Sequence, residues 1–140
     1  MITISHQNLD QTNLYTTVLQ SVEDVCDEYQ LSKEFGIIST ACQEVVDYLT
    51  EHHPSFMTDM EIFIDNTSLS YNFYCAEPLF GELLSHYADE NILKDLSDKI
   101  EVSSDNKQVS ITFHVKTHIP ISTPKSAMQT QYQEMLHRNF

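Results

Sequence analysis

Glycine is the residue that this chain nearly lacks, because only Gly36 and Gly81 occur among its 140 residues. A protein of average composition and this length contains about ten glycines. Glycine permits positive φ angles and lets a backbone approach a ligand closely, and the loops that hold phosphates in common nucleotide sites depend on it. Two isolated glycines cannot build such a loop, so the sequence counts against the common nucleotide-binding motifs.

The chain is strongly acidic, with 21 aspartates and glutamates against 7 lysines and arginines, a net charge of −14 and a pI near 4.6. A field of this sign repels DNA, RNA and anionic lipid, so we expect neither nucleic acid nor a membrane as a partner. It favours solubility or a basic protein partner. The acids are concentrated before residue 106 and only Glu134 follows it, whereas the last 25 residues carry Lys116, Lys125 and Arg138.

The three cysteines, Cys26, Cys42 and Cys75, are odd in number and form no Cys-x-x-Cys pair. Each lies within an apolar pattern, which predicts buried free thiols in a reducing compartment. The first six residues lack the basic segment and apolar run of a signal peptide. No stretch approaches 18 consecutive apolar residues. We therefore expect a cytoplasmic protein.

Hydrophobic periodicity predicts a two-layer α+β sandwich, with helices packed on one face of a mixed, mostly antiparallel sheet. The expected elements are a strand at 2–4, helices at 10–30 and 32–52, strands at 60–64 and 69–75, a helical segment at 79–99, and strands at 100–102 and 109–115. Ser32 is the expected N-cap of the second helix. Residues 1–116 form the predicted domain and 117–140 a tail, in which 127–136 is either a short helix or disordered.

This order resembles the GHKL (Bergerat-fold) ATPase superfamily, and within it the small anti-sigma-factor serine kinases of bacteria. Three pieces carry the resemblance: the first strand with its long helix, the helix 38–52 that leads into paired strands, and the ending 91–113. That ending is similar to the family's last helix, strand entry and closing hairpin. The resemblance covers residues 1–116 and rests on pattern and order.

The family's first nucleotide-binding box is altered in this sequence. In active members the second helix carries Glu-x-x-x-Asn-x-x-x-His, whose glutamate assists catalysis and whose asparagine ligates magnesium. Glu44 and His52 match the outer positions, but Tyr48 occupies the asparagine position, and tyrosine is a poor ligand for octahedral Mg²⁺. A register shifted by one residue puts Asp47 there but replaces the outer pair by Gln43 and Glu51.

Two further boxes of the family have no counterpart. The Asp-x-Gly-x-Gly box that reads adenine corresponds to residues 75–81, which lack the pattern and contain Pro78. The glycine-rich lid corresponds to residues 87–91, which contain two carboxylates and no glycine. The resemblance therefore implies a domain that has kept the scaffold and lost the nucleotide.

Glu44, Asp47 and Glu51 are spaced i, i+3 and i+7, so they share one face of the second helix. At about 100° per residue, that face lies roughly 150° from the apolar stripe of the helix. The three carboxylates are candidates for holding a cation or for contacting a basic partner. A solvated outer face accounts for the same spacing.

Histidine and cysteine provide weaker candidates. His52 and His53 end the second helix, where a histidine interacts favourably with the helix dipole. His114 and His118 are about 13 Å apart if both lie on a strand, too far to share a metal ion, so no metal site is predicted. A nucleophilic Cys42 paired with His52 or His86 is disfavoured because Cys42 belongs to the apolar stripe.

Three hypotheses about function follow. The first is a non-catalytic regulatory domain that needs no cofactor and binds a protein partner through Glu44, Asp47 and Glu51 or through its tail. By resemblance, that partner is a sigma factor or an antagonist protein, and a homodimer is possible. The second is a divergent ATP-dependent serine/threonine kinase, with Glu44 as the catalytic acid or base and Asp47 and Glu77 binding magnesium and ATP. The third is an unrelated α+β domain of a larger assembly.

Overall fold

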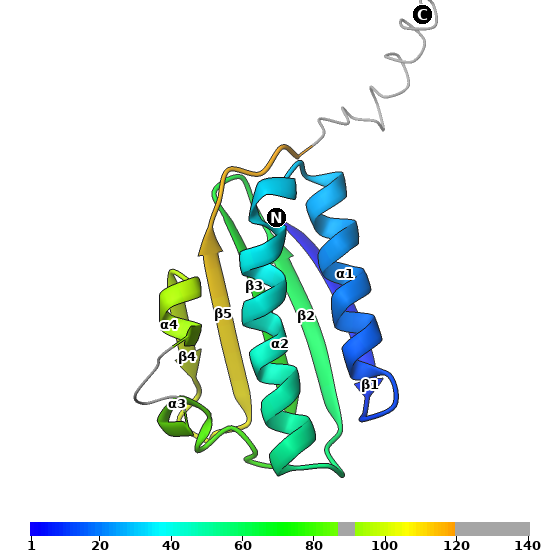
Figure 1. The fold of residues 1–140 in the computed structure, drawn as a ribbon, viewed down its shortest axis with the longest axis vertical. Coiled ribbons are helices and arrows are strands. Elements are labelled where there is room, and N and C mark those ends of the chain that lie inside the picture. The colour runs from blue at the N-terminus through cyan, green and yellow to red at the C-terminus, as the bar shows by residue number, and fades with distance from the viewer. Residues whose placement is uncertain (87–91, 120–140) are drawn as a thin grey trace, which may run out of the picture.

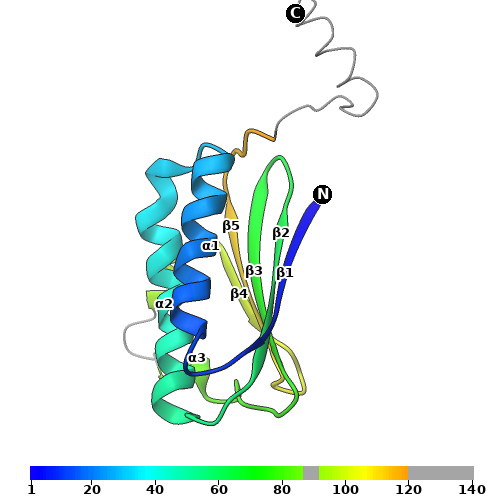
Figure 2. The same cartoon turned by 90° about the vertical axis from the view of Figure 1, so that its right-hand side faces the viewer.

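The computed structural model describes residues 1–86 and 92–119, which fold into one layer of helices on one sheet (Figures 1 and 2). In chain order the elements are β1 (Ile2–Leu9), α1 (Leu14–Glu28), the 3₁₀ turn η1 (Ser32–Glu34), α2 (Phe35–His52), β2 (Thr58–Ile64), β3 (Ser68–Cys75), α3 (Leu83–His86), α4 (Ile92–Leu96), β4 (Lys99–Val102) and β5 (Gln108–His114). The α+β fold class predicted from the sequence is confirmed.

The sheet has five strands in the order β1-β2-β3-β5-β4, and all four pairings are antiparallel. The sequence predicts a mixed sheet with some parallel pairing. That part of the prediction is wrong for the described strands, whereas the antiparallel part is confirmed. β1 joins the sheet across a long separation, since Ile2 pairs with Ile64. β1 and β4 form the two edges of the sheet. The two long helices, α1 and α2, lie on the same face of the sheet (Figure 2).

The core fills the space between α1 and α2 and the sheet face beneath them. Alternate residues of the inner strands point into it, because successive side chains of a strand face opposite sides. The largest side chains without solvent contact include Tyr71, Phe73, Phe80, Leu49 and Met60. Burial of apolar surface at about 25 cal/mol per Å² is the main term that holds the two layers together.

The face of the sheet turned away from the helices is polar. Asn72, which is 4% exposed, lies at its centre. Its amide nitrogen donates to the Glu61 carbonyl at 3.3 Å and to Ser70 Oγ at 3.1 Å, and its amide oxygen accepts a hydrogen bond from the Ser110 hydroxyl. These bonds connect β2, β3 and β5. The polar pattern of this face follows from the strict alternation in the central strands.

Several expected boundaries differ from the structure, and three of the differences concern more than the end of an element by a few residues or have a clear physical reason. β1 extends to Leu9, well beyond the predicted strand at 2–4, because pairing with β2 holds its polar second half in the sheet. Ser32 begins a 3₁₀ turn and makes no side-chain cap, so its prediction as an N-cap was wrong. The segment 79–99 is not one helix: Leu79 and Phe80 lie in a loop, two short helices follow, and Lys99 already belongs to β4.

The left-handed backbone positions of the described residues are occupied without glycine. Asn8, Gln30 and Asn106 all have φ of 60°, and neither glycine has a positive φ. Gln30 follows the end of α1, where the Leu31 amide donates to the Cys26 carbonyl at 2.8 Å. Glycine is usual at this position because a side chain is strained there. Asparagine and glutamine thus occupy the left-handed backbone positions at which glycine is usual.

The chain beyond β5 stays on the domain for several residues. The Thr117 amide donates to the Asn66 carbonyl at 3.2 Å, and the His118 amide donates to the Tyr29 carbonyl at 3.2 Å. These bonds hold the segment between the β2–β3 turn and the end of α1. The rest of the expected tail, including the helix proposed for 127–136, lies outside the described residues. Within the described part of the chain, no helix is both long and apolar enough to cross a membrane.

Candidate functional site

The helix layer presents an acidic surface. α1 and α2 together carry seven carboxylates and neither lysine nor arginine. Those residues are Glu23, Asp24, Asp27, Glu28, Glu44, Asp47 and Glu51. Their outer position follows from the helical period, because the buried residues of each helix occupy the opposite face. The arrangement produces a negative potential over the helices, suited to attracting a positively charged partner.

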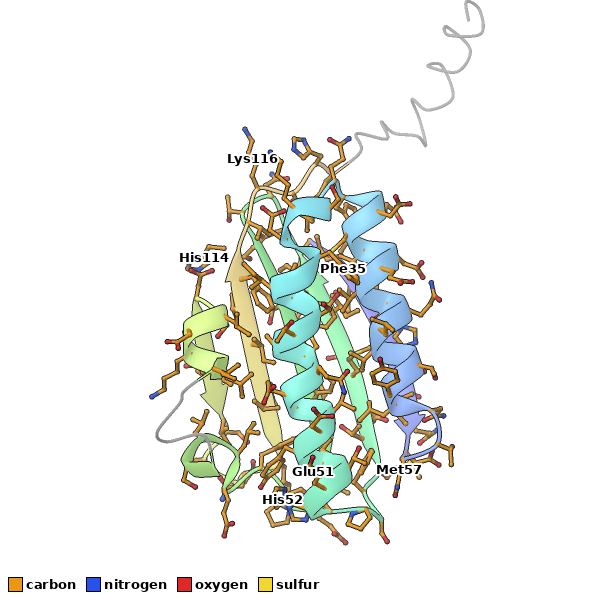
Figure 3. All side chains as sticks on the ribbon, viewed as in Figure 1. Phe35, Glu51, His52, Met57, His114 and Lys116 are labelled. Atoms are coloured by element: carbon orange, nitrogen blue, oxygen red, sulfur yellow. The ribbon has the colours of Figure 1, made fainter. Side chains whose placement is uncertain are left out.

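The three carboxylates selected from the sequence all lie within α2. Glu51 is exposed, whereas Glu44 and Asp47 are partly covered. Asp47 accepts a hydrogen bond of 2.8 Å from Gln43, one helical turn before it. Figure 3 shows Glu51 next to His52 at the end of α2, with Lys116 at the opposite end of the molecule. α2 is one continuous helix, which is consistent with the shared face that the spacing of the three carboxylates predicts.

Tyr48 occupies the position at which the sequence resemblance to the ATPases expects a magnesium ligand, and it is 2% exposed. Its hydroxyl donates to the Leu79 carbonyl at 3.0 Å, which ties α2 to the segment that follows β3. The His52 ring stacks on it with centroids 5.0 Å apart, and the His53 ring meets it edge-on at 5.6 Å. The bond from Tyr48 to Leu79 cannot be predicted from the sequence, because the two residues are 31 positions apart.

The segment 75–81 is fixed against the β4–β5 turn. The Cys75 amide donates to the Lys107 carbonyl at 2.8 Å, and the Phe80 amide donates to the Asn106 carbonyl at 3.0 Å. Phe80 is fully buried, and Glu77 is exposed. A loop held in this way, with a buried aromatic side chain, resembles a structural clamp more closely than a ligand-binding loop.

Two small cavities lie beside this clamp, of about 190 and 120 Å³. Glu77 and Leu79 line both, together with Phe56 and Ser55. Sites for ligands of drug or cofactor size are usually about 300–1,000 Å³. Neither Glu44 nor Asp47 lines either cavity, so neither cavity brings Glu77 together with the two α2 carboxylates assigned to the alternative kinase site.

The three cysteines are buried free thiols, as predicted. Burial raises the pKa of Cys26 to about 11, with a smaller contribution from Glu34, and burial also raises the pKa of Cys42 and Cys75. Cys42 and His52 are ten residues apart on one helix, a rise of about 15 Å, so they cannot form a nucleophile–base pair. His114 and His118 are both exposed. Among residues 1–86 and 92–119, no group of three or more His, Cys, Asp or Glu side chains could hold a metal ion.

A larger groove of about 550 Å³ lies between α1 and the edge strand β1. Its walls are Ile4, His6, Thr16, Thr17, Gln20, Ser21, Asp24 and Val25. The sequence does not predict this groove, because the groove depends on β1 being an edge strand and on small residues of α1 facing that edge. The only indication in the sequence is that the small residues Thr16, Thr17 and Ser21 lie beside the apolar stripe of α1.

No protein-family model matches the chain, and no curated protein is significantly similar to it.

Proposed function

We propose that this chain is a non-catalytic regulatory domain that binds a protein partner, built on a scaffold similar to the anti-sigma-factor ATPases. The observation that carries the proposal is the buried Tyr48 bound to the Leu79 carbonyl. It fills the position where an active member needs a magnesium ligand. The clamped segment 75–81 and the small volume of the two cavities beside it support the same conclusion.

The charge of the helix layer supports a basic partner. Seven carboxylates without lysine or arginine on α1 and α2 provide long-range attraction, which raises association rates for a partner of opposite charge. Glu44, Asp47 and Glu51 form the proposed contact face on α2. By resemblance, the partner is a sigma factor or an antagonist protein in the cytoplasm. The proposal requires no cofactor, whereas the alternative, a divergent serine/threonine kinase, requires ATP and magnesium.

Thermal unfolding with and without millimolar Mg-ATP or Mg-ADP tests the loss of nucleotide binding. A ligand that binds only the folded state adds about 2.7 kcal/mol of stability at one hundred times its Kd. We expect no change in Tm with either nucleotide. A clear rise in Tm would contradict the proposal and favour the kinase, and a rise abolished by Asp47→Ala but kept by Glu44→Gln would assign the roles of that alternative.

Affinity capture tests the contact face. The full chain is compared with a variant in which Glu44, Asp47 and Glu51 are all changed to lysine. The matched control changes the exposed acids Glu82, Asp95 and Glu101 to lysine, which alters the net charge equally. We expect proteins retained by the wild type to be lost with the α2 variant and kept with the control. Equal loss with both variants would contradict a specific face on α2.

A further inference from the structure

The first part of the edge strand β1, Ile2–His6, lacks the usual protection against pairing, since the register irregularity of the strand lies after it, between His6 and Leu9. β1 is eight residues long, pairs with β2 on one side only among the described residues, and contains no lysine, arginine or proline. Natural proteins shield exposed edges with charged residues, proline or very short strands, because the free N–H and C=O groups pair with other chains. β4, the opposite edge, has only four residues and carries the ion pair between Lys99 and Glu101, with Nζ and Oε2 3.5 Å apart.

α1 lies beside this edge strand, on the helix side of the sheet (Figures 1 and 2). The groove is lined by residues of both elements. Ile4 of β1 and Val25 of α1 provide apolar wall. Thr17 and Ser21 are small, which leaves space between the helix and the strand. A strand added to β1 lies about 4.8 Å from it and directs alternate side chains to the helix side. Those side chains would enter the groove, so it matches the residues of a sixth strand.

The charge of the groove specifies the chemistry of that strand. Asp24 lines it and accepts a hydrogen bond of 3.0 Å from Gln20. Glu28 follows one helical turn later on the same side of α1 and is exposed. Neither α1 nor β1 supplies a lysine or arginine to these carboxylates. An incoming strand therefore gains from one lysine or arginine among its groove-facing residues.

We propose that β1 binds an extended segment of a protein partner as a sixth strand, with apolar side chains and a lysine or arginine in the groove. The proposal rests on the proposed function, since it defines one mode by which the domain binds a partner. A second copy of this chain fits less well, because β1 and α1 contain no lysine or arginine that could face Asp24 of the other copy. Each copy also carries a net charge of −14.

The probe is the acetylated and amidated heptapeptide Thr-Val-Thr-Lys-Thr-Val-Thr, which presents valine, lysine and valine on one face. It is titrated into the ¹⁵N-labelled full chain, and the amide shifts of Ile2–His6 and of α1 are followed. We expect saturable shifts at these residues. Replacing the lysine of the peptide by glutamate should weaken binding by about tenfold or more, because the new charge faces Asp24.

Two N-methylated peptides test strand pairing at constant charge, one methylated on the threonine amides and the other on the valine and lysine amides. Alternate residues of a strand direct their N–H groups to opposite sides. We therefore expect one of the two peptides to lose binding and the other to retain it. Equal binding by both would overturn strand addition.

The protein variants are Asp24→Lys and the control Glu23→Lys, an exposed residue that lies about 100° around α1 from Asp24 and does not line the groove. We expect about tenfold weaker binding for Asp24→Lys and a change within about twofold for Glu23→Lys. Equal effects of both variants would overturn the proposal in favour of non-specific charge attraction. Absence of shifts in the wild type at millimolar peptide would also overturn it.

Two other occupants are separate outcomes of the same titration. Peptide-induced shifts in residues 120–140 would identify the chain's own tail as the occupant, and dissociation of a dimer by the peptide would identify a second copy. Each result overturns the assignment to a partner. Failure of strand addition leaves the nucleotide and α2 tests of the proposed function unaffected, so the two failures are distinguishable.

Discussion

The hydroxyl of Tyr48 donates a hydrogen bond of 3.0 Å to the backbone carbonyl of Leu79 and thereby joins α2 to the segment after β3. Removing the hydroxyl leaves that carbonyl without this donor. We expect Tyr48→Phe to lower the free energy of unfolding by about 1 kcal/mol. Urea unfolding measures the change, and Tyr15→Phe, at an exposed tyrosine of α1, is the control and should stay within about 0.5 kcal/mol of wild type. A loss no greater than that of the control would show that the bond does not stabilise the domain.

Gln30 is a position where a glycine should stabilise the protein. Its φ of 60° is strained for a residue with a Cβ atom, and the side chain is exposed. Gln30→Gly should raise the free energy of unfolding by about 0.5–1 kcal/mol, after the greater freedom of glycine in the unfolded chain is counted. Thr40→Gly, at an exposed site inside α2, should instead destabilise by a few tenths of a kcal/mol. Destabilisation by both glycines would refute the prediction.

Asp65 makes the stability of the β2–β3 turn depend on pH. Its carboxylate accepts hydrogen bonds from the Thr67 amide at 3.0 Å, the Ser68 hydroxyl at 3.0 Å and the Ser68 amide at 2.8 Å. The Thr67 amide, followed by the Ser68 hydroxyl, lowers the pKa of Asp65 below its ordinary value. This stabilisation is complete above the unfolded pKa, about 3.9, and is lost as pH falls through the lower folded pKa.

The corresponding measurement is urea unfolding of wild type and Asp65→Ala between pH 7 and pH 3. The wild type should be the more stable protein from pH 7 to about pH 5, by a constant difference. That difference should shrink as the pH falls below about 4. A difference that stays the same at pH 3 would show that the ionised carboxylate does not hold the turn.

The thiols should be unreactive in the folded protein. Cys42 is fully buried, and burial raises the pKa of all three cysteines, so very little thiolate is present near pH 8. We expect slow labelling by a thiol reagent in buffer and rapid labelling of all three cysteines in urea. Immediate reaction of Cys42 in the folded state would revive its interpretation as a nucleophile.

The elements that the sequence predicts well are those with an unbroken period. β5 was expected at 109–115 and lies at Gln108–His114, because its alternation is maintained by pairing on both sides. α1 and α2 follow their apolar stripes in the same way. The second half of β1 could not be predicted, since residues such as Gln7 and Asn8 have no apolar pattern. They lie at the register irregularity between the paired residues His6 and Leu9, where the Asn8 amide donates to the Asp59 carboxylate of β2 at 2.8 Å.

The candidate sites also differ in how much of their geometry can be predicted from the sequence. The common face of Glu44, Asp47 and Glu51 follows from helix geometry alone, so spacing was sufficient to predict it. The bond from Tyr48 to Leu79 could not be predicted, because it joins elements whose relative position depends on the whole fold. The same holds for the groove beside β1, which requires the strand order and not merely the presence of a strand.

The pairing of Ile2 with Ile64 also has a consequence for how the chain reaches its native state. β2 and β3 are adjacent in sequence and form a hairpin. β1 is separated from its partner β2 by the two long helices α1 and α2 in the sequence. Domains with many such distant contacts fold in about milliseconds to seconds, more slowly than helical bundles. We therefore expect β1 to be added late. Its mutations should act mainly on the rate of unfolding, and those in the β2–β3 hairpin mainly on the rate of folding.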